Sequence, residues 1–313
     1  MTEYRQPVGT AFALRDPIPW TDLAAMVRAA EQVGYAAVFL PEIAGRDALV
    51  TLGALAGETR DLLLGTGVVP IASRTPLLAA MAASTVHERS GGRLILGLGT
   101  GRIGPGALDR LREEVDVLRG LFAGETVEHG GERLRLSLAP GTGPPIWISA
   151  LGPRAMRLAG EIADGVLLNW CPPERVAAAR AVVAGGAGAA GRDPDDVTVA
   201  VYVRAWVGED EATAMTALRR ASAEYASYPA YARQFEQVGL GAEAAAAADA
   251  LRAGRVEDVP DRLVRSVCAI GPEAPRRIEA YRQAGATLPV VYPVAAGEAA
   301  VSIEGTLSAL APG

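Results

Sequence analysis

Two glycine-containing segments of the sequence could hold a phosphorylated or flat ligand. Residues 99–104 read GTGRIG, which matches the dinucleotide pattern GxGxxG between an apolar run and a helical pattern. Nicotinamide binding of this kind also needs an acidic residue at a strand end about 20 positions later, and Glu125 falls in a predicted loop instead. The glycines would still let the backbone approach such a ligand closely.

A second segment, SALGPRAM at residues 149–156, runs from a predicted strand into a predicted helix. Pro153 suits the first helical turn, which leaves the backbone amides near Leu151 and Gly152 free to face a phosphate, and Arg154 adds positive charge. An ordinary strand-to-helix turn accounts for the same residues equally well, so both interpretations are kept.

Few side chains of this sequence could transfer a proton. His87 lies in a helical pattern and is predicted to be structural, and His129 lies in a predicted hairpin. Glu42 is the only carboxylate that directly follows a predicted strand in the first half of the chain, so it is the candidate acid, with a solvated loop glutamate as the alternative. Arg74 and Arg102 follow the next two strands and could bind phosphate or carboxylate groups, or form ordinary surface ion pairs.

The composition excludes several classes of function. All 30 basic residues are arginine, and a chain without lysine has no Schiff-base chemistry and no phosphate-binding loop of the GxxxxGK type. The net charge of -6 argues against nucleic acid or an anionic membrane as a partner. No apolar run reaches about 18 residues, and the first residues lack the basic and apolar regions of a signal peptide, so a cytoplasmic protein is expected.

The cysteines give no sign of a disulfide or a metal site. Cys171 and Cys268 lie far apart in the sequence, without a CxxC pattern or histidine-rich surroundings. Both are predicted to be ordinary buried thiols, and no metal is expected.

The elements that must position these residues alternate along the chain between apolar runs and helical patterns. Eight such strands with intervening helices in 313 residues predict a (β/α)8 TIM barrel rather than an open doubly wound sheet. Gly34, Gly165 and Gly285 are predicted to end helices in the left-handed conformation before the next strand. The predicted strands cover residues 8–13, 37–40, 63–69, 94–99, 146–150, 165–168, 198–207 and 288–292. The predicted helices include residues 20–33, 76–90, 107–122, 153–162 and 272–284.

Two segments interrupt this repeat within what is expected to be one domain over residues 1–313. Residues 123–145 are predicted to form a hairpin, and the alanine-rich residues 208–256 are predicted to be helical. The second segment follows the seventh strand and should cover the C-terminal face, where barrel active sites lie. Its aromatic residues recur at roughly helical spacing, which is more typical of a core than of a pocket. They are Tyr225, Tyr228, Tyr231 and Phe235.

Three blocks of the sequence resemble the bacterial luciferase-like superfamily, and specifically its deazaflavin-dependent oxidoreductases. The first block covers residues 39–101 and contains LGTGV and SGGRLILGLGTG. The second, PPIWISALGPRAMRLAGEIADGV, covers residues 144–166, and the third, AYRQAGATLPVVYPV, covers residues 280–294. The resemblance implies a (β/α)8 barrel with an extra region near the seventh strand. It also implies hydride transfer between coenzyme F420 and a small organic substrate.

The resemblance assigns residues to the ring of the cofactor by matching position. Gly67 and Val68 are expected to form a bulge behind the central ring of the deazaflavin, with a cis peptide bond between them. Thr100 and Gly101 are expected to flank the ring or the tail of the cofactor.

The same matching assigns residues to the phosphate and the acidic tail. Ala150, Leu151 and Gly152 are expected to bind the phosphate. Arg102 follows the fourth strand, where its bulk would either grip the acidic tail or block the site.

One position departs from the pattern of this family. Many relatives end the second strand with Asp-His, whereas this chain has Pro41 and Glu42. The usual histidine donor is therefore missing, and Glu42 is its expected replacement, with water as the alternative. Two other functions stay open, an FMN-dependent monooxygenase that uses reduced flavin and oxygen, and a noncatalytic flavin-binding homologue. A homodimer is expected, because apolar helices on the outside of the barrel suit an interface.

Overall fold

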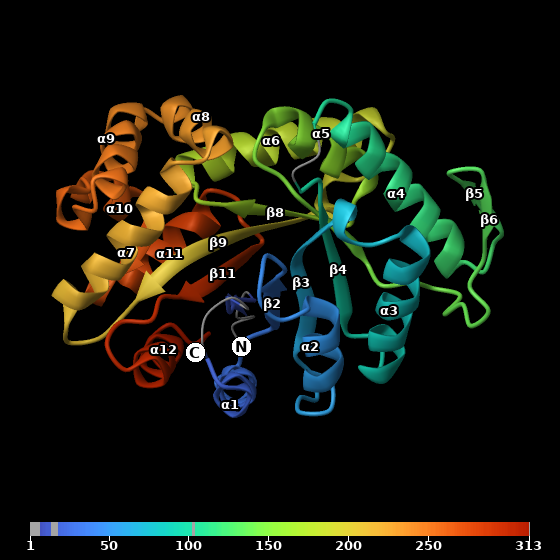
Figure 1. The fold of residues 1–313 in the computed structure, drawn as a ribbon, viewed down its shortest axis with the longest axis horizontal. Coiled ribbons are helices and arrows are strands. Elements are labelled where there is room, and N and C mark those ends of the chain that lie inside the picture. The colour runs from blue at the N-terminus through green and yellow to red at the C-terminus, as the bar shows by residue number, and fades with distance from the viewer. Residues whose placement is uncertain (1–6, 14–17, 102–103, 313) are drawn as a thin grey trace, which may run out of the picture.

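Apolar runs of this chain become strands that are covered on both faces, because a parallel barrel sheet buries both of its faces. The computed structural model describes residues 7–13, 18–101 and 104–312. Its barrel strands are β1 (Gly9–Ala11), β2 (Ala37–Pro41), β3 (Leu63–Pro70), β4 (Leu94–Gly99), β7 (Ile146–Ser149), β8 (Gly165–Asn169), β9 (Thr198–Trp206) and β11 (Leu288–Pro293). All pairings among them are parallel, and β9 pairs with both β8 and β11, which closes the sheet (Figure 1). The predicted (β/α)8 TIM barrel is therefore confirmed.

The helices that surround the barrel follow the strands in sequence, as Figure 1 shows. Several of them have a proline in the first turn. Backbone N–H groups in the first turn have no acceptor within the helix, so a proline there costs no hydrogen bond. All eight predicted strands are present, and their ends lie within two residues of the predicted ends. The helices are α1 (Trp20–Gln32), α2 (Ala48–Leu55), α3 (Pro76–Arg89), α4 (Ala107–Phe122), α5 (Pro153–Ile162), α6 (Pro173–Ala189), α11 (Ala274–Gln283) and α12 (Ala299–Ala309).

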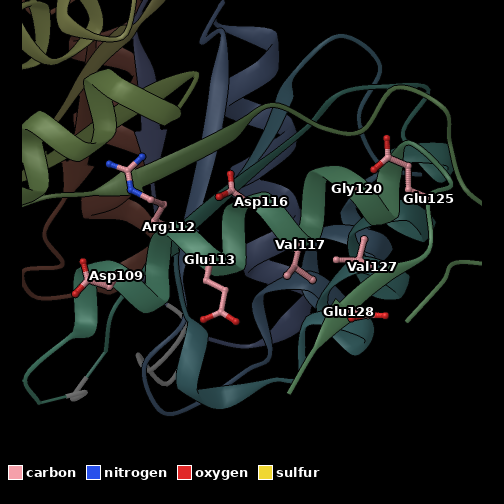
Figure 2. Close-up of a pocket in the computed structure, with 9 residues that line it drawn as sticks. All are labelled: Asp109, Arg112, Glu113, Asp116, Val117, Gly120, Glu125, Val127 and Glu128. Atoms are coloured by element: carbon pink, nitrogen blue, oxygen red, sulfur yellow. The ribbon is translucent and has the colours of Figure 1, made fainter. Parts of the chain in front are cut away.

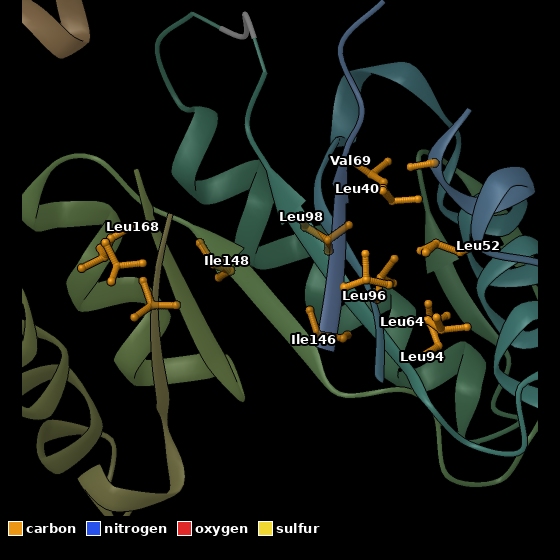
Figure 3. Close-up of a cluster of buried hydrophobic side chains, with 14 of the residues drawn as sticks. Leu40, Leu52, Leu64, Val69, Leu94, Leu96, Leu98, Ile146, Ile148 and Leu168 are labelled. Atoms are coloured by element: carbon orange, nitrogen blue, oxygen red, sulfur yellow. The ribbon is translucent and has the colours of Figure 1, made fainter. Parts of the chain in front are cut away.

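The main core lies between the strands and these helices. Side chains at alternate positions of each strand point outward, so Leu94, Leu96 and Leu98 of β4 all join it. Figure 3 shows these leucines between the strands and the surrounding helices, beside Ile146 and Ile148 of β7. The core is continuous from one strand to the next, as the burial of both faces of the sheet requires.

Large aromatic rings fill the interior of the barrel, opposite glycines on neighbouring strands. A Cβ atom on Gly65 would lie 2.3 Å from the Phe39 ring, and one on Gly165 would lie 2.5 Å from the Trp147 ring. The ring centroids of Phe39 and Trp147 are 5.3 Å apart. The interior therefore depends on large side chains and glycines that face one another.

The three glycines that were predicted to end helices have two different roles. Gly34 and Gly285 adopt the predicted left-handed conformation, with φ of +93° and +100°. The prediction for Gly165 is wrong, because this residue begins β8 and has no positive φ. Its missing side chain instead leaves room for the ring of Trp147.

Both predicted insertions are present. The first contains the two-stranded antiparallel hairpin of β5 (Val127–His129) and β6 (Glu132–Leu134). The second contains α7 (Glu211–Ala226), α8 (Pro229–Gln237) and α9 (Gly241–Arg252). In Figure 1 the hairpin lies at the right edge of the molecule and the orange helices of the second insertion at the upper left.

The second insertion continues beyond its predicted end. After α9 the chain forms α10 (Asp261–Val267) and a short parallel strand, β10 (Cys268–Ile270), that pairs with the last three residues of β9. This strand was not predicted, because a three-residue apolar run after a helical pattern reads as part of the helix. Side chains of α7 to α10 and β10 form a second core with Trp170 and Trp206.

Cys171 and Cys268 are both buried free thiols, as predicted. Among the described residues, no helix combines the length and the apolar character that crossing a membrane would require.

A buried carboxylate lies on α4, where it faces the hairpin side of the barrel. Glu114 is only 7% exposed. Burial raises the pKa of Glu114 to about 7, against the opposing charge of His129 and with a contribution from Glu113. The folded protein thus keeps a proton that the unfolded chain releases at lower pH. Between the ordinary pKa of a glutamate and about 7, the unfolded chain gives up this proton and the folded protein keeps it. The stability of the folded state therefore falls as the pH rises through this range.

We expect Glu114→Gln to raise the melting temperature at about pH 8 and to have much less effect at about pH 5, because glutamine has no charge to bury. A gain of about 1 kcal/mol would correspond to about 2 to 4 °C in a chain of this size. Thermal unfolding at both pH values measures the difference, with Asp116→Asn on the same helix as the control, since Asp116 is exposed and is not among the groups that shift the pKa of Glu114. Equal shifts of Glu114→Gln at both pH values would contradict the explanation.

Candidate active site

A cavity of about 500 Å³ opens at the C-terminal ends of the barrel strands. Strand ends provide Val68, Ser149 and Asn169 to its wall, and the second insertion provides Tyr225 and Tyr231. This is the face at which TIM barrels place their active sites, because the loops after every strand meet there. The insertion therefore covers the mouth of the barrel, as predicted.

The cavity brings together seven of the eight residues that were predicted to bind the cofactor. They come from the ends of three adjacent strands, β3, β4 and β7, and from the start of α5. Arg102, the eighth, lies outside the described residues. Their roles as ligands stay predictions. The seven are Gly67, Val68, Thr100, Gly101, Ala150, Leu151 and Gly152.

The predicted bulge of β3 is present. Toward β4, the register moves from Gly65 opposite Ile95 to Val69 opposite Leu98, which leaves one extra residue on β3. The Thr66 hydroxyl donates to the carbonyl of Gly97 at 2.9 Å and accepts from its N–H at 2.7 Å. Side-chain hydrogen bonds thus replace the interrupted ladder.

The peptide bond between Gly67 and Val68 was expected to be cis, and this expectation is wrong. No cis peptide bond occurs among the described residues. The shift in register on both sides of β3 accommodates the extra residue with trans bonds. The bulge therefore avoids the cost of a non-prolyl cis bond, which is about 3 to 4 kcal/mol.

Gly67 lies directly against the hydroxyl of Tyr202, which extends from β9 across the barrel. A Cβ atom at Gly67 would lie 1.9 Å from the Tyr202 oxygen. That hydroxyl is buried and has no hydrogen-bond partner among the described residues. Burial raises the pKa of Tyr202 well above its ordinary value, so the group stays a neutral phenol. The bulge needs glycine here because a side chain would collide with this ring.

The start of α5 provides a different kind of surface. Gly152 is the N-cap residue, Pro153 follows in the first turn, and no side chain caps the helix. The position of a Cβ atom at Gly152 has no other atom within 4 Å. Unpaired N–H groups at a helix N-terminus attract anions, and the open space beside Gly152 leaves room for one.

Glu42 is not among the residues that line the cavity. Its carboxylate accepts hydrogen bonds from the Ala48 N–H at 3.0 Å and from the Arg74 guanidinium at 2.7 Å. Its two neighbours, Pro41 and Ile43, do line the cavity, and its own N–H donates to the carbonyl of Val68 at 2.8 Å. The backbone of Glu42 therefore adjoins the bulge, while its carboxylate lies beside the start of α2.

Arg74 was predicted to place a cation at the rim of the site. The structure pairs its guanidinium with the carboxylates of Glu42 and Asp47, and Arg74 does not line the cavity. Burial opposes the ionisation of Asp47, but the hydrogen bonds from Val50 and Arg74 outweigh it, so the pKa of Asp47 lies below its ordinary value. The three side chains form a compact ionic group around the N-terminus of α2.

The sequence pattern led to no prediction for Arg204, Tyr202 and Tyr292, which form a polar part of the cavity wall. Arg204 and Tyr202 lie on β9, Asn169 ends β8, and Tyr292 lies on β11. In the β9 segment TVAVYVRAW, strict alternation places Ala200, Tyr202 and Arg204 on the same inner face, with Arg204 nearest the mouth. Counting that alternation outward from the strand centre would have identified the arginine.

The aromatic residues of the second insertion were expected to belong to a core, and this is confirmed for Phe235, while Tyr225 and Tyr231 pack against the same core from its edge. Phe235 is fully buried, whereas Tyr225, Tyr228 and Tyr231 line the cavity. The Tyr231 hydroxyl accepts a hydrogen bond from the side-chain amide of Asn169 at 2.8 Å. The insertion thus forms a wall of the site as well as its own core.

A second hollow, shown in Figure 2, lies between α4 and the hairpin. It contains no residue from the C-terminal end of a barrel strand. Its lining carries one arginine among several carboxylates, and Gly120, Val117 and Val127 complete it. Neither the predicted binding residues nor the second insertion contributes to this hollow, so it is separate from the candidate active site. The charged residues in it are Asp109, Arg112, Glu113, Asp116, Glu125 and Glu128.

Comparison with known proteins agrees with this arrangement. A family model described as luciferase-like monooxygenase matches residues 4–288. A 5,10-methylenetetrahydromethanopterin reductase of Methanolobus tindarius is 35% identical over 223 residues, which cover 67% of this chain and 68% of the relative. An F420-dependent hydroxymycolic acid dehydrogenase of Mycobacterium tuberculosis is 35% identical over 189 residues, which cover 54% of this chain and 51% of the relative.

Solved structures share the fold over nearly the whole chain. The structure of the coenzyme F420 dependent tetrahydromethanopterin reductase from Methanopyrus kandleri matches with a TM-score of 0.80 and covers 98% of both chains. Sequence identity over this match is 24%, so the likeness establishes the fold rather than the chemistry.

The contact between Gly67 and Tyr202 can be tested by a double-mutant cycle. We expect Gly67→Ala to lower the melting temperature, because the new methyl group and the Tyr202 hydroxyl cannot occupy the same space. Tyr202→Phe alone should preserve or raise stability, since burying an unpaired hydroxyl costs about 1 to 3 kcal/mol.

The double variant should recover a substantial part of the loss caused by Gly67→Ala, measured by thermal unfolding of all four proteins. Strictly additive effects of the two substitutions would show that the ring and the bulge do not constrain each other.

Proposed function

Because the chain belongs to the luciferase-like monooxygenase family, we propose that it is a coenzyme F420-dependent oxidoreductase that transfers a hydride between the deazaflavin and a small organic substrate. The observation that carries this proposal is a single cavity that contains both the bulge of β3 and the open start of α5. A flat ring and a phosphorylated tail need two such surfaces within reach of one another.

The residues present suit this cofactor. Val68 offers a stiff apolar surface for the ring at the bulge, and Gly67 keeps the backbone close to it. Thr100 and Gly101 lie on the adjacent strand end. Ala150, Leu151 and Gly152 would bind the phosphate at the N-terminus of α5, where the space beside Gly152 is open. The deazaflavin supplies or accepts the hydride, and the protein orients it and excludes water.

We propose that Glu42 supplies the proton that accompanies this hydride when a substrate is reduced. Its support is its place in the chain, between two residues that line the cavity, and its backbone hydrogen bond to Val68 in the bulge. Its hydrogen bonds to Ala48 and Arg74 hold the carboxylate beside the start of α2. Turnover through Glu42 would require its carboxyl group to leave these partners.

We also propose that the enzyme is a cytoplasmic homodimer. Its support is an exposed apolar surface on α2 and α3, where Val50 is 72%, Leu78 is 49% and Met81 is 52% exposed around one shallow hollow. An exposed apolar patch of this kind suits a twofold interface. Two buried thiols without a disulfide agree with a reducing compartment.

A binding titration separates the deazaflavin from FMN. We expect coenzyme F420 to bind at least about tenfold more tightly than FMN, a difference of about 1.4 kcal/mol, measured by fluorescence quenching on the purified chain. Equal or reversed affinities, together with oxygen consumption in the presence of reduced FMN, would favour the monooxygenase instead.

Gly152→Val tests where the phosphate lies in the same assay. A Cβ at this position meets no protein atom, so the substitution should preserve folding while it blocks the approach of the phosphate. Affinity should then fall at least about tenfold at an unchanged melting temperature. Gly188→Val on α6, which also meets no neighbouring atom and does not line the cavity, is the matched control.

The role of Glu42 is tested by comparing Glu42→Gln with Asp47→Asn. Both residues pair with Arg74, but only Glu42 is the proposed proton donor. Glu42→Gln should lower kcat by about 10²- to 10⁴-fold without weakening cofactor binding, and should remove one limb of the pH profile of kcat. Asp47→Asn should lower kcat far less. Equal losses in both variants would assign Glu42 to the support of Arg74 and α2.

A further inference from the structure

Arg204 is a buried cation for which the described residues provide no ionic partner. The residue is 5% exposed, yet it lines the cavity on the inner face of β9. It donates one hydrogen bond, from a guanidinium nitrogen to the side-chain carbonyl of Asn169, and it takes part in no ion pair with a described carboxylate. A charge withdrawn from water in this way is costly unless a counter-charge arrives.

Aromatic rings hold this guanidinium in place. It lies 4.1 Å from the centroid of the Tyr292 ring and 4.5 Å from that of Trp170, with Tyr225 at 5.5 Å and Tyr202 at 5.7 Å. Ring faces attract a cation but do not neutralise it. The arginine is therefore held by the rings and by Asn169, which accepts its one hydrogen bond to a described residue, and it lines the cavity.

The amide of Asn169 links Arg204 to a second donor. A guanidinium can only donate, so the oxygen of the Asn169 amide must face Arg204 and its nitrogen must face Tyr231. The Tyr231 oxygen consequently acts as the acceptor, and its own proton has no acceptor among the described residues. Burial raises the pKa of the Tyr231 phenol, so that proton stays on the oxygen at neutral pH.

These two donors match a carboxylate better than a phosphate. Arg204 is the only cationic side chain among the described lining residues, and Glu224 adds a carboxylate to the same wall. A phosphate dianion would need a second cation to balance it, whereas a carboxylate monoanion needs one. Tyr225, Tyr228 and Tyr292 surround the same region with aromatic surface, which suits an apolar or aromatic body.

We propose that Arg204 and Tyr231 bind the carboxylate of the substrate, and that the substrate is a small organic acid with an apolar or aromatic body. This deepens the proposed function and rests on it, because it names the class of molecule that would exchange the hydride. Asn169 acts as a positioning residue that holds both donors.

The test compares benzoate with benzamide, which has the same shape without the charge. Isothermal titration calorimetry on the full chain, without cofactor, should show that benzoate binds at least about tenfold more tightly. Arg204→Met should reduce benzoate binding to the level of benzamide and leave benzamide unchanged. Arg220→Met is the matched control, because Arg220 lies on α7 and is exposed to solvent. It should preserve the preference for benzoate.

Tyr231→Phe keeps the test decisive if Arg204→Met fails to fold. It removes only the hydroxyl, so we expect benzoate to lose about fivefold or more in affinity and benzamide to lose less, because a hydrogen bond to a charged acceptor is the stronger one. Equal binding of benzoate and benzamide by the native chain would overturn the proposal. An undiminished preference in Arg204→Met, or in Tyr231→Phe when the arginine variant does not fold, would overturn it as well.

A parallel titration with coenzyme F420 separates this inference from the proposed function. Arg204→Met should change the affinity for the deazaflavin less than twofold. If the native chain distinguishes benzoate from benzamide but does not bind the deazaflavin, the proposed function fails and the anion site stands. If Arg204→Met weakens the deazaflavin as strongly as it weakens benzoate, Arg204 belongs to the cofactor and the inference fails.

Discussion

The structure depends on the packing of large rings against glycines inside a closed barrel. Trp147 meets Gly165, Phe39 meets Gly65, and Tyr202 meets Gly67. The rings also contact one another in series, from Trp147 through Phe39 and Tyr202 to Tyr292, with centroids between 5.3 and 6.4 Å apart. They fill the interior from the level of Gly165, the first residue of β8, to the cavity. The space that a ligand can enter is therefore limited to the ends of the strands.

The same series of rings continues into the candidate site. Tyr292 contacts the guanidinium of Arg204, and Trp170 and Tyr225 contact it from the side of the insertion. The barrel interior and the insertion are thus joined through one charged side chain. The bulge of β3 contacts the same series of rings, because Gly67 lies against the hydroxyl of Tyr202. The ring series, the bulge and the buried guanidinium of Arg204 are therefore linked by direct contacts.

Local patterns were sufficient to predict the barrel, because alternating strands and helices with clear ends leave few other topologies. The helices of residues 107–122 and 153–162 have the predicted ends. Long-range contacts were less accessible. The role of Gly165 depends on a ring from another strand, and the trans bulge depends on pairing with two neighbouring strands. Alternation along β9 is enough to place Arg204 on the inner face, but its significance comes from the rings and the amide around it, which residues 169–170, Tyr225 and Tyr292 provide.

The second insertion is tied to the barrel by a contact that limits how it can be exchanged. The side-chain amide of Gln234 in α8 donates to the carbonyls of Asn169 at 2.9 Å and of Trp170 at 2.6 Å. At this point β8 ends, and Trp170 adopts a left-handed backbone conformation with φ of +52°, which is unusual for a bulky residue. A segment transplanted from a relative to alter specificity would need a donor at the same place. Without one, the end of β8 would lose its support, and the graft would change the shape of the barrel itself along with its covering.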